Sequence, residues 1–153
     1  MVRNTGSAHF VNVSSTAGPS FTEPQAHRGA AFADFDNDGR IDVVVTNQNS
    51  LPDVFLNRSP GSHHWLMVRL IGTRSNHDGL GAQLKLTVSG RPPIYNHATT
   101  SMGFSASSDP RVHFGLGSAD RVESLEIRWP SGIRQTLNGI RADQILLVRE
   151  PER

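Results

Sequence analysis

The sequence predicts an all-β protein. Its 14 glycines and nine prolines interrupt short apolar runs, and no segment keeps the helical apolar period for three turns. Several runs instead alternate apolar and polar residues, which is the pattern of a β-strand with one buried face. We expect about nine strands and no helix, an arrangement that favours a sandwich or a barrel over an α/β fold.

Five runs carry the strand signal. Residues 125–129 alternate most regularly and form the clearest predicted strand. Residues 66–70 and 84–88 alternate in the same way. Residues 41–45 and 145–148 are apolar almost throughout, which predicts strands that are covered on both faces.

Turn-forming residues separate these runs. Residues 129–132 read Trp-Pro-Ser-Gly, and proline second with glycine fourth is typical of a type I turn. This turn would join strands near 122–129 and 133–137. We also expect a tight turn at the Asn-Gly pair 138–139 and a break at residues 76–79.

Length and composition exclude several classes of protein. A chain of 153 residues with 36% hydrophobic residues can bury a core without covalent staples. It has no cysteine, which excludes disulfides, thiolate zinc sites and cysteine nucleophiles. The formal net charge is +1 and the arginines are scattered, which argues against nucleic-acid binding. No run approaches the ~20 apolar residues of a membrane span, and the first residues have no signal-peptide pattern.

A change in composition divides the chain near the Ser-Pro-Gly-Ser segment 59–62. We expect two units. Residues 1–60 contain an acidic loop, and residues 61–153 contain the regularly alternating strands. Neither unit occurs a second time in these residues, so the sequence has no internal repeat.

One segment carries a chemical signal. Residues 34–42 read Asp-Phe-Asp-Asn-Asp-Gly-Arg-Ile-Asp, with carboxylates at loop positions one, three, five and nine and glycine at position six. Hard oxygen ligands at alternate positions, with a glycine that permits a sharp turn, suit Ca²⁺, which takes six to eight oxygens at ~2.3–2.6 Å. The sequence therefore predicts a calcium site. Its expected ligands are Asp34, Asp36, Asp38, Asp42 and, through its backbone carbonyl, Arg40.

The charge of this loop supports the calcium hypothesis. Unit charges ~4 Å apart repel by roughly 4 kcal/mol at an effective dielectric constant of about 20. Within the loop only Arg40 is basic, so we expect no local ion pair to neutralise the carboxylates. The alternative is a solvated acidic turn, because Asp-Gly and Asn-Asp are common turn formers. An EF-hand is excluded, since position twelve is Val45 and the flanking segments are strand-like.

Both parts of the chain resemble known families. Residues 28–47, which surround the acidic loop, resemble the FG-GAP/VCBS calcium-binding repeat, the blade unit of integrin-like β-propellers. The rest of the chain is similar to an ASPIC/UnbV domain, a module that follows such repeats in many bacterial secreted proteins. The matching stretches are Gly-Leu-Gly-Ala at 79–82, His-Phe-Gly-Leu-Gly at 113–117, and residues 122–132 and 142–150.

The resemblance implies one propeller-blade-like unit packed on, or linked to, a β-sandwich or barrel-like ASPIC/UnbV domain. It also implies a non-enzymatic module of the extracellular space or cell envelope, with structural Ca²⁺ on the five ligands named above and an unknown protein or glycan partner. Family members usually hold several repeats, whereas this chain holds one. A lone blade would leave an open edge. We therefore expect either the C-terminal part of a longer repeat protein or a blade that packs against the following domain.

The histidines offer a hypothesis of another class. His63 and His64 precede Trp65, and together with His113 they could form the site of a hydrolase or of a carbohydrate-active accessory domain. No H-E-x-x-H or G-x-S-x-G motif supports this, and surface or turn histidines are the simpler interpretation. Convergence of these histidines in one cleft would favour it. Trp65 remains a candidate for stacking a sugar, whereas Trp129 is in phase with the apolar residues of its strand and should belong to the core.

A third hypothesis is assembly. The unpaired edge of the blade could dock onto upstream repeats or onto a second copy of the chain. In the second case the protein would associate in a concentration-dependent way.

Overall fold

The computed structural model describes residues 1–152, apart from the side chain of Ser20. This part of the chain has no α-helix, and therefore no helix long and apolar enough to cross a membrane. The all-β prediction is confirmed, with more strands than the nine or so expected. The strands are β1 (Val2–Gly6), β2 (His9–Asn12), β3 (His27–Ala33), β4 (Asp42–Asn47), β5 (Asp53–Phe55), β6 (His64–Ile71), β7 (Gln83–Thr87), β8 (Ile94–His97), β9 (Val112–Gly117), β10 (Arg121–Arg128), β11 (Arg134–Arg141) and β12 (Gln144–Arg149), with two 3₁₀ helices, η1 (Ser14–Thr16) and η2 (Pro19–Phe21).

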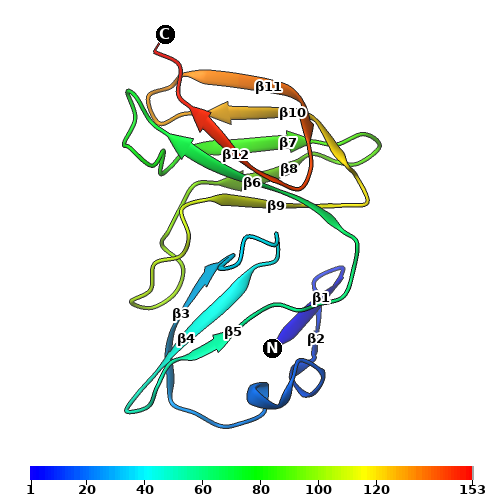
Figure 1. Ribbon diagram of the computed structural model, residues 1–153, viewed down its shortest axis with the longest axis vertical. Helices are drawn as coiled ribbons and strands as arrows, with labels where there is room; N and C mark the ends of the chain where they lie inside the picture. Colours follow the sequence, from blue (N-terminus) through cyan, green and yellow to red (C-terminus); the bar gives the residue numbers. More distant parts are fainter. Residues whose placement is uncertain (153) are drawn as a thin grey trace.

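The strands form four sheets in two lobes (Figure 1). The N-terminal lobe contains the hairpin β1–β2 and the sheet β3-β4-β5. The C-terminal lobe is a sandwich of the sheets β11-β10-β7-β8 and β12-β6-β9. Residues 56–63, which contain no strand, join the lobes and are called the linker below. The predicted division at residue 60 stays a prediction, and it falls in this linker.

The hydrophobic core lies between the two sheets of the C-terminal lobe. A single cluster of buried apolar side chains draws on both sheets. Leu66, Val68 and Leu70 point into it from β6, as the alternation of that strand predicts. Trp129 follows β10, is 1% exposed and belongs to the same cluster, which confirms its predicted place in the core.

The opposite face of β6 is turned toward the N-terminal lobe. Trp65 and Met67 alternate with the core residues, and Met67 is buried although it lies outside the core cluster. His113 of β9 pairs with Met67 across the sheet, so its side chain shares this face. The sandwich therefore offers the N-terminal lobe a surface that contains an indole and an imidazole.

Two strands are less buried than their apolar sequences predict. β12 is the edge strand of its sheet, and Ile145 and Leu147 are 40% and 60% exposed. Residues 43–45 in β4 are only half-buried. The prediction that both strands are covered on both faces is thus wrong. The reason for β4 is that the described part of the N-terminal lobe contains no fully buried apolar side chain that could pack over it.

The turns show where local sequence decides the structure. The amide of Gly132 donates to the carbonyl of Trp129 at 2.9 Å, which confirms the predicted turn between β10 and β11. The amide of Gly79 likewise donates to the carbonyl of Asn76 at 2.9 Å. The turn expected at residues 138–139 is wrong. These residues lie inside β11, where Asn138 pairs with Ser124, because pairing with the long strand β10 overrides the local turn preference.

The C-terminal lobe covers one edge of the N-terminal sheet. Residues 104–109 lie along β3, where the amide of Phe32 donates to Ser108 Oγ at 3.1 Å and the amide of Asp109 donates to the carbonyl of Phe32 at 2.9 Å. A Cβ atom at Gly29 would lie 2.5 Å from the carbonyl oxygen of Phe104, so this approach requires glycine. The blade therefore packs against the following domain, one of the two arrangements expected.

Candidate metal centre

The acidic loop connects β3 to β4, and the two strands set its ends. Asp34 follows the last residue of β3, and Asp42 is the first residue of β4. Between them Asn37 and Gly39 have φ angles of 58° and 86°, which curl the chain back on itself. As a result Asp34, Asp36 and Asp42 each offer a carboxylate oxygen within 4.8 Å of the others.

Two of these carboxylates are buried and take no part in an ion pair among the described residues. Asp34 and Asp42 are each 2% exposed. Asp34 accepts the amides of Asp38 (3.1 Å) and Gly39 (2.8 Å). Asp42 accepts the amides of Phe35 (2.9 Å) and Asn57 (2.7 Å). In residues 1–152 neither carboxylate forms an ion pair with a basic side chain, so amides satisfy their hydrogen bonds. The guanidinium of Arg111 attracts the charge of Asp34 from outside ion-pair range.

The donor set fits a calcium ion. An ionised carboxylate has about four lone-pair positions, so an oxygen that accepts one amide can also bind a cation. Three carboxylates converge here, and hard oxygen ligands are what Ca²⁺ prefers. The structure thus groups Asp34, Asp36 and Asp42 out of the five predicted ligands.

The other predicted ligands are engaged with each other. Asp38 accepts the amide of Arg40 at 2.8 Å and forms an ion pair with its guanidinium at 2.6 Å. The backbone hydrogen bond from Arg40, with its guanidinium and that of Arg58 nearby, outweighs desolvation and holds the pKa of Asp38 below its ordinary value. Coordination by Asp38 and by the Arg40 carbonyl stays a prediction.

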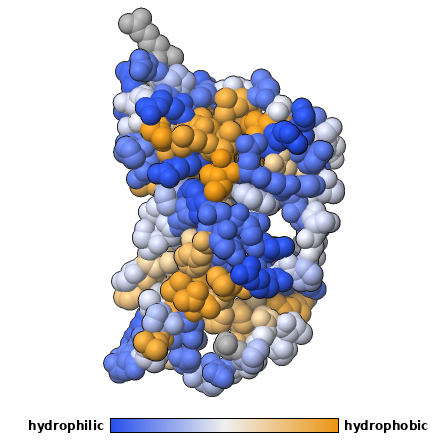
Figure 2. Space-filling view, in the orientation of Figure 1, coloured by the Kyte–Doolittle hydropathy of each residue, from blue (hydrophilic) through white to orange (hydrophobic). Residues whose placement is uncertain are grey.

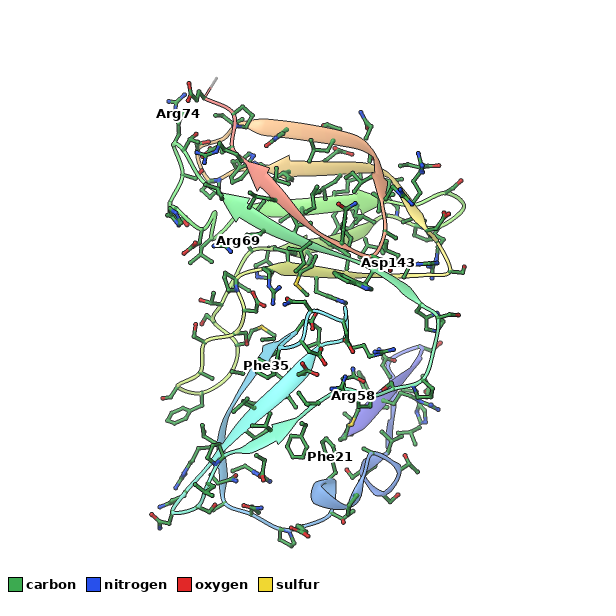
Figure 3. All side chains as sticks on the ribbon, in the orientation of Figure 1. Phe21, Phe35, Arg58, Arg69, Arg74 and Asp143 are labelled. Atoms are coloured by element: carbon green, nitrogen blue, oxygen red, sulfur yellow. The ribbon has the colours of Figure 1, made fainter. Side chains whose placement is uncertain are left out.

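The expectation that no ion pair neutralises the loop is wrong. Besides Arg40, the linker contributes Arg58, whose Nη1 lies 2.8 Å from Asp36 and 3.5 Å from Asp38 (Figure 3). Arg40 is the basic residue inside the loop, whereas Arg58 reaches the loop from the linker after β5. Its side chain is 62% exposed, so solvent screens these pairs strongly.

Sequence reasoning missed the residues that fix the loop from the other lobe. Arg111, just before β9, donates Nη1 to Asn37 Oδ1 at 2.7 Å and Nη2 to the carbonyl of Asp34 at 3.0 Å. Asp109 holds the guanidinium in place through Nε at 2.7 Å, and this hydrogen bond raises the pKa of Arg111. The contacts of Arg111 with Asn37 and Asp34 join residues more than 70 positions apart, and no local pattern marks them.

Two further side chains of the C-terminal lobe contact the glycine of the loop. His113 donates Nε2–H to the carbonyl of Gly39 at 2.9 Å. The indole of Trp65 lies so close to Gly39 that an added Cβ atom would overlap it. The sequence explains Gly39, at loop position six, by the sharp turn. The contact with Trp65 shows that the neighbouring lobe also requires glycine at this position.

Three of the candidate histidines do converge. His63, His64 and His113 line one cavity of about 380 Å³, which we call the junction cavity, together with Trp65. Asp143, at the turn before β12, accepts Nδ1–H of His64 at 2.6 Å (Figure 3). In the described chain, however, no hydroxyl forms a hydrogen bond with a histidine ring, so no nucleophile is paired with a base.

Comparisons with known proteins agree with the two lobes. Residues 1–45 match the model of the FG-GAP-like repeat, a range that contains the acidic loop. Residues 72–153 match the model of the ASPIC and UnbV family, and this match covers more than half of the chain.

Three curated relatives with similar sequence identity to this chain come from vertebrates. Cartilage acidic protein 1 of Xenopus tropicalis is 30% identical over 107 residues, which are 68% of this chain and 16% of the relative. The Mus musculus protein of the same name is 30% identical over 114 residues, 72% of this chain and 17% of the relative. The Homo sapiens protein is 29% identical over the same number of residues. The chain thus spans about one sixth of the length of these relatives and belongs to the ASPIC and UnbV family, with an FG-GAP-like repeat at its N-terminal end.

Proposed function

We propose that this protein is a non-enzymatic, calcium-binding module of the extracellular space or cell envelope, in which the ion orders the acidic loop. The observation that carries the proposal is the convergence of Asp34, Asp36 and Asp42, two of them buried. The match to an FG-GAP-like repeat over residues 1–45 supports it. A divalent cation would place positive charge directly against these buried oxygens.

A structural role for the ion follows from where the loop lies. The loop is the part of the N-terminal lobe that Arg111, His113 and Trp65 contact. Neutralising the carboxylates would relieve repulsion in one of the segments that hold the lobes together. An ion that binds only the folded loop stabilises the protein by about 2.7 kcal/mol at 100 times its dissociation constant.

Chelation tests this proposal directly. Removing Ca²⁺ with EDTA should lower the melting temperature by about 5–10 °C, and excess Ca²⁺ should restore it. Asp36→Asn should abolish the response, because it removes one of the three converging carboxylates. Asp36 is exposed, so the substitution should leave the fold intact. Asp78→Asn, at an exposed aspartate outside the loop, is the matched control. An intact protein whose melting temperature ignores both EDTA and Ca²⁺ would contradict the proposal.

The same titration decides the role of Asp38. If Asp38 is a ligand, Asp38→Asn should weaken calcium binding as much as Asp36→Asn does. If it serves only to hold Arg40, the variant should bind Ca²⁺ nearly normally.

A hydrolase is the second candidate, and the convergence of the histidines favours it. In that case His64, oriented by Asp143, would be the general base. Turnover of nitrophenyl ester or glycoside substrates that disappears in His64→Ala and persists in His9→Ala would support the enzyme. No turnover by the intact protein would remove this candidate.

A further inference from the structure

The junction cavity lies where the two lobes and the linker meet. Its walls are the loop residues 38–41, the linker residues 59–61 and 63, the start of β6 at residues 64–65, and His113 of β9. Figure 2 shows an opening between the lobes on the side where Figure 1 draws the linker. The volume of about 380 Å³ is at the lower end of the range of small-molecule sites, roughly 300–1,000 Å³.

The charges that line the cavity cancel. Asp38 and Arg40 are its acidic and basic residues, and they are paired with each other at 2.6 Å. A phosphate or a carboxylate would meet no surplus positive charge here, and a cation would meet no surplus negative charge. In residues 1–152 no three histidine or carboxylate donor atoms lie within metal-binding range except those of Asp34, Asp36 and Asp42, so the histidines do not form a second metal site. A neutral ligand fits this lining.

Two histidines of the lining each use one ring nitrogen in a hydrogen bond within the protein, which leaves the second ring nitrogen as an acceptor for such a ligand. A carboxylate and a carbonyl can only accept, so His64 must hold a proton on Nδ1 and His113 must hold one on Nε2. In the neutral rings the other nitrogens, Nε2 of His64 and Nδ1 of His113, then carry lone pairs. The guanidinium of Arg40 adds N–H donors beyond the one given to Asp38. The lining therefore offers both hydrogen-bond donors and acceptors.

The cavity also has aromatic surfaces. The indole of Trp65 is half-buried and rests on the backbone of Gly39, which fixes its orientation. The imidazoles of His63 and His64 precede it in the chain. Rigid aromatic faces combined with hydrogen-bonding groups suit a ring that has an apolar C–H face and a rim of hydroxyl groups.

We infer that the junction cavity binds a neutral saccharide, of one or two sugar rings, between Trp65 and the histidines. Hydroxyl groups both donate and accept hydrogen bonds, so they match the acceptor nitrogens of His64 and His113 and the donors of Arg40. This inference rests on the proposed function at one point, because residues 38–41 of the calcium loop form one wall. Loss of Ca²⁺ should therefore weaken saccharide binding.

The test is a titration of the calcium-loaded protein with chitobiose, cellobiose, lactose and mannobiose. Trp129 is 1% exposed, so a saturable change in tryptophan fluorescence would report on Trp65. The imidazole of His63 also lines the cavity and can form one further hydrogen bond with the saccharide. Calorimetry should therefore show His63→Ala weakening the affinity roughly 3- to 10-fold, the worth of that one bond. His63 is exposed, so its removal should leave the melting temperature unchanged. His9→Ala, on the exposed hairpin β1–β2, is the matched control.

Several outcomes would overturn the inference. They are no saturable binding of any of the four disaccharides, equal affinity in His63→Ala and His9→Ala, or tighter binding of a glucuronate-containing disaccharide than of the neutral ones. Failure of the calcium proposal would look different. The melting temperature would then ignore EDTA, whereas saccharide binding would persist and be the same with and without Ca²⁺.

Discussion

The two lobes are built on opposite physical principles. The C-terminal lobe encloses a cluster of fully buried apolar side chains between two sheets. In the described part of the N-terminal lobe no apolar side chain is fully buried, and the deeply buried side chains are the carboxylates of Asp34 and Asp42. One lobe has the ordinary hydrophobic driving force for folding, whereas the other must be held by polar contacts, by its neighbour and, as we propose, by an ion.

The contacts between the lobes reflect this difference. The C-terminal lobe supplies Arg111, His113 and Trp65 to the loop, and Ser108 to the edge of β3. Within the N-terminal lobe the aromatic packing is slight, with the stacked pair Phe21 and Phe55 at a centroid distance of 4.6 Å (Figure 3). We therefore expect the N-terminal lobe to open at lower free energy than the sandwich.

Truncating an apolar side chain in each lobe should give the largest contrast. Leu86→Ala, at a fully buried position of β7, should lower the free energy of unfolding by about 2–5 kcal/mol because it leaves a cavity. Val54→Ala, at a 58% exposed position of β5, should change it by less than about 0.5 kcal/mol. Urea unfolding measures both. Similar losses at the two sites would contradict the proposed difference between the lobes.

Glu150 should make the sandwich sensitive to acid. Its carboxylate is 1% exposed and accepts the hydroxyls of Ser131 and Ser75 and the amides of Thr73, Arg74 and Ser75. Burial alone would raise its pKa, but these hydrogen bonds outweigh burial and lower it from 4.5 to about 2. The carboxylate therefore fastens the end of β12 to the loop after β6, near Arg74 in Figure 3.

The sign of the pH effect follows from that lowered pKa. The unfolded chain binds the proton more tightly, so the contribution of Glu150 is complete above pH 4.5 and is lost as the pH falls toward 2. Its upper limit is roughly 3 kcal/mol. Glu150→Gln should lose that stability at pH 7 and approach the unmodified protein near pH 2, in urea unfolding at both values. Glu126→Gln, at an exposed pair with Lys85, should cost little at either pH.

Arg111 should couple the sandwich to the calcium loop. Arg111→Lys keeps the charge but loses the fork that reaches Asn37 and the carbonyl of Asp34, so calcium affinity should fall about tenfold. Arg121→Lys, at an exposed position of β10, is the control. Calorimetric titration with Ca²⁺ measures the change. Equal affinities in the two variants would show that the loop is organised within its own lobe.

The smallest effect is expected at Arg58. Its guanidinium pairs with Asp36 and Asp38 but is 62% exposed, so Arg58→Gln should change the stability of the calcium-loaded protein by less than about 1 kcal/mol. Because Arg58 competes with a cation for Asp36, the same variant should bind Ca²⁺ slightly more tightly. Weaker calcium binding in this variant would instead indicate that Arg58 orders the site.

Features that depend on neighbouring residues in the sequence were predictable. The alternation in β6 and β10, the turn at residues 129–132 and the acidic loop with its glycine were all visible in the sequence. The hairpin β1–β2 was missed because its residues are exposed on both faces and carry no alternating pattern. Pairing with β10 drew residues 138–139 into a strand.

The site was predictable only in part, for the same reason. The spacing of the aspartates marks the loop, but which of them converge depends on its folded shape, and Asp38 turned to Arg40. The contribution of Arg111 depends on a contact between lobes more than 70 residues apart. The meeting of His63 and His113 in one cavity depends on the pairing of β6 with β9.

Gly39 limits how far the two lobes can be treated as interchangeable parts. Its φ of 86° suits the curl of the loop, and its bare Cα leaves room for the indole of Trp65. An alanine at position 39 would be strained at this positive φ, and its Cβ atom would also clash with the indole of Trp65. A chimera that joins this sandwich to a repeat from another protein must therefore keep a glycine at position 39 or a smaller side chain at position 65. Otherwise the two lobes cannot pack against each other as they do here.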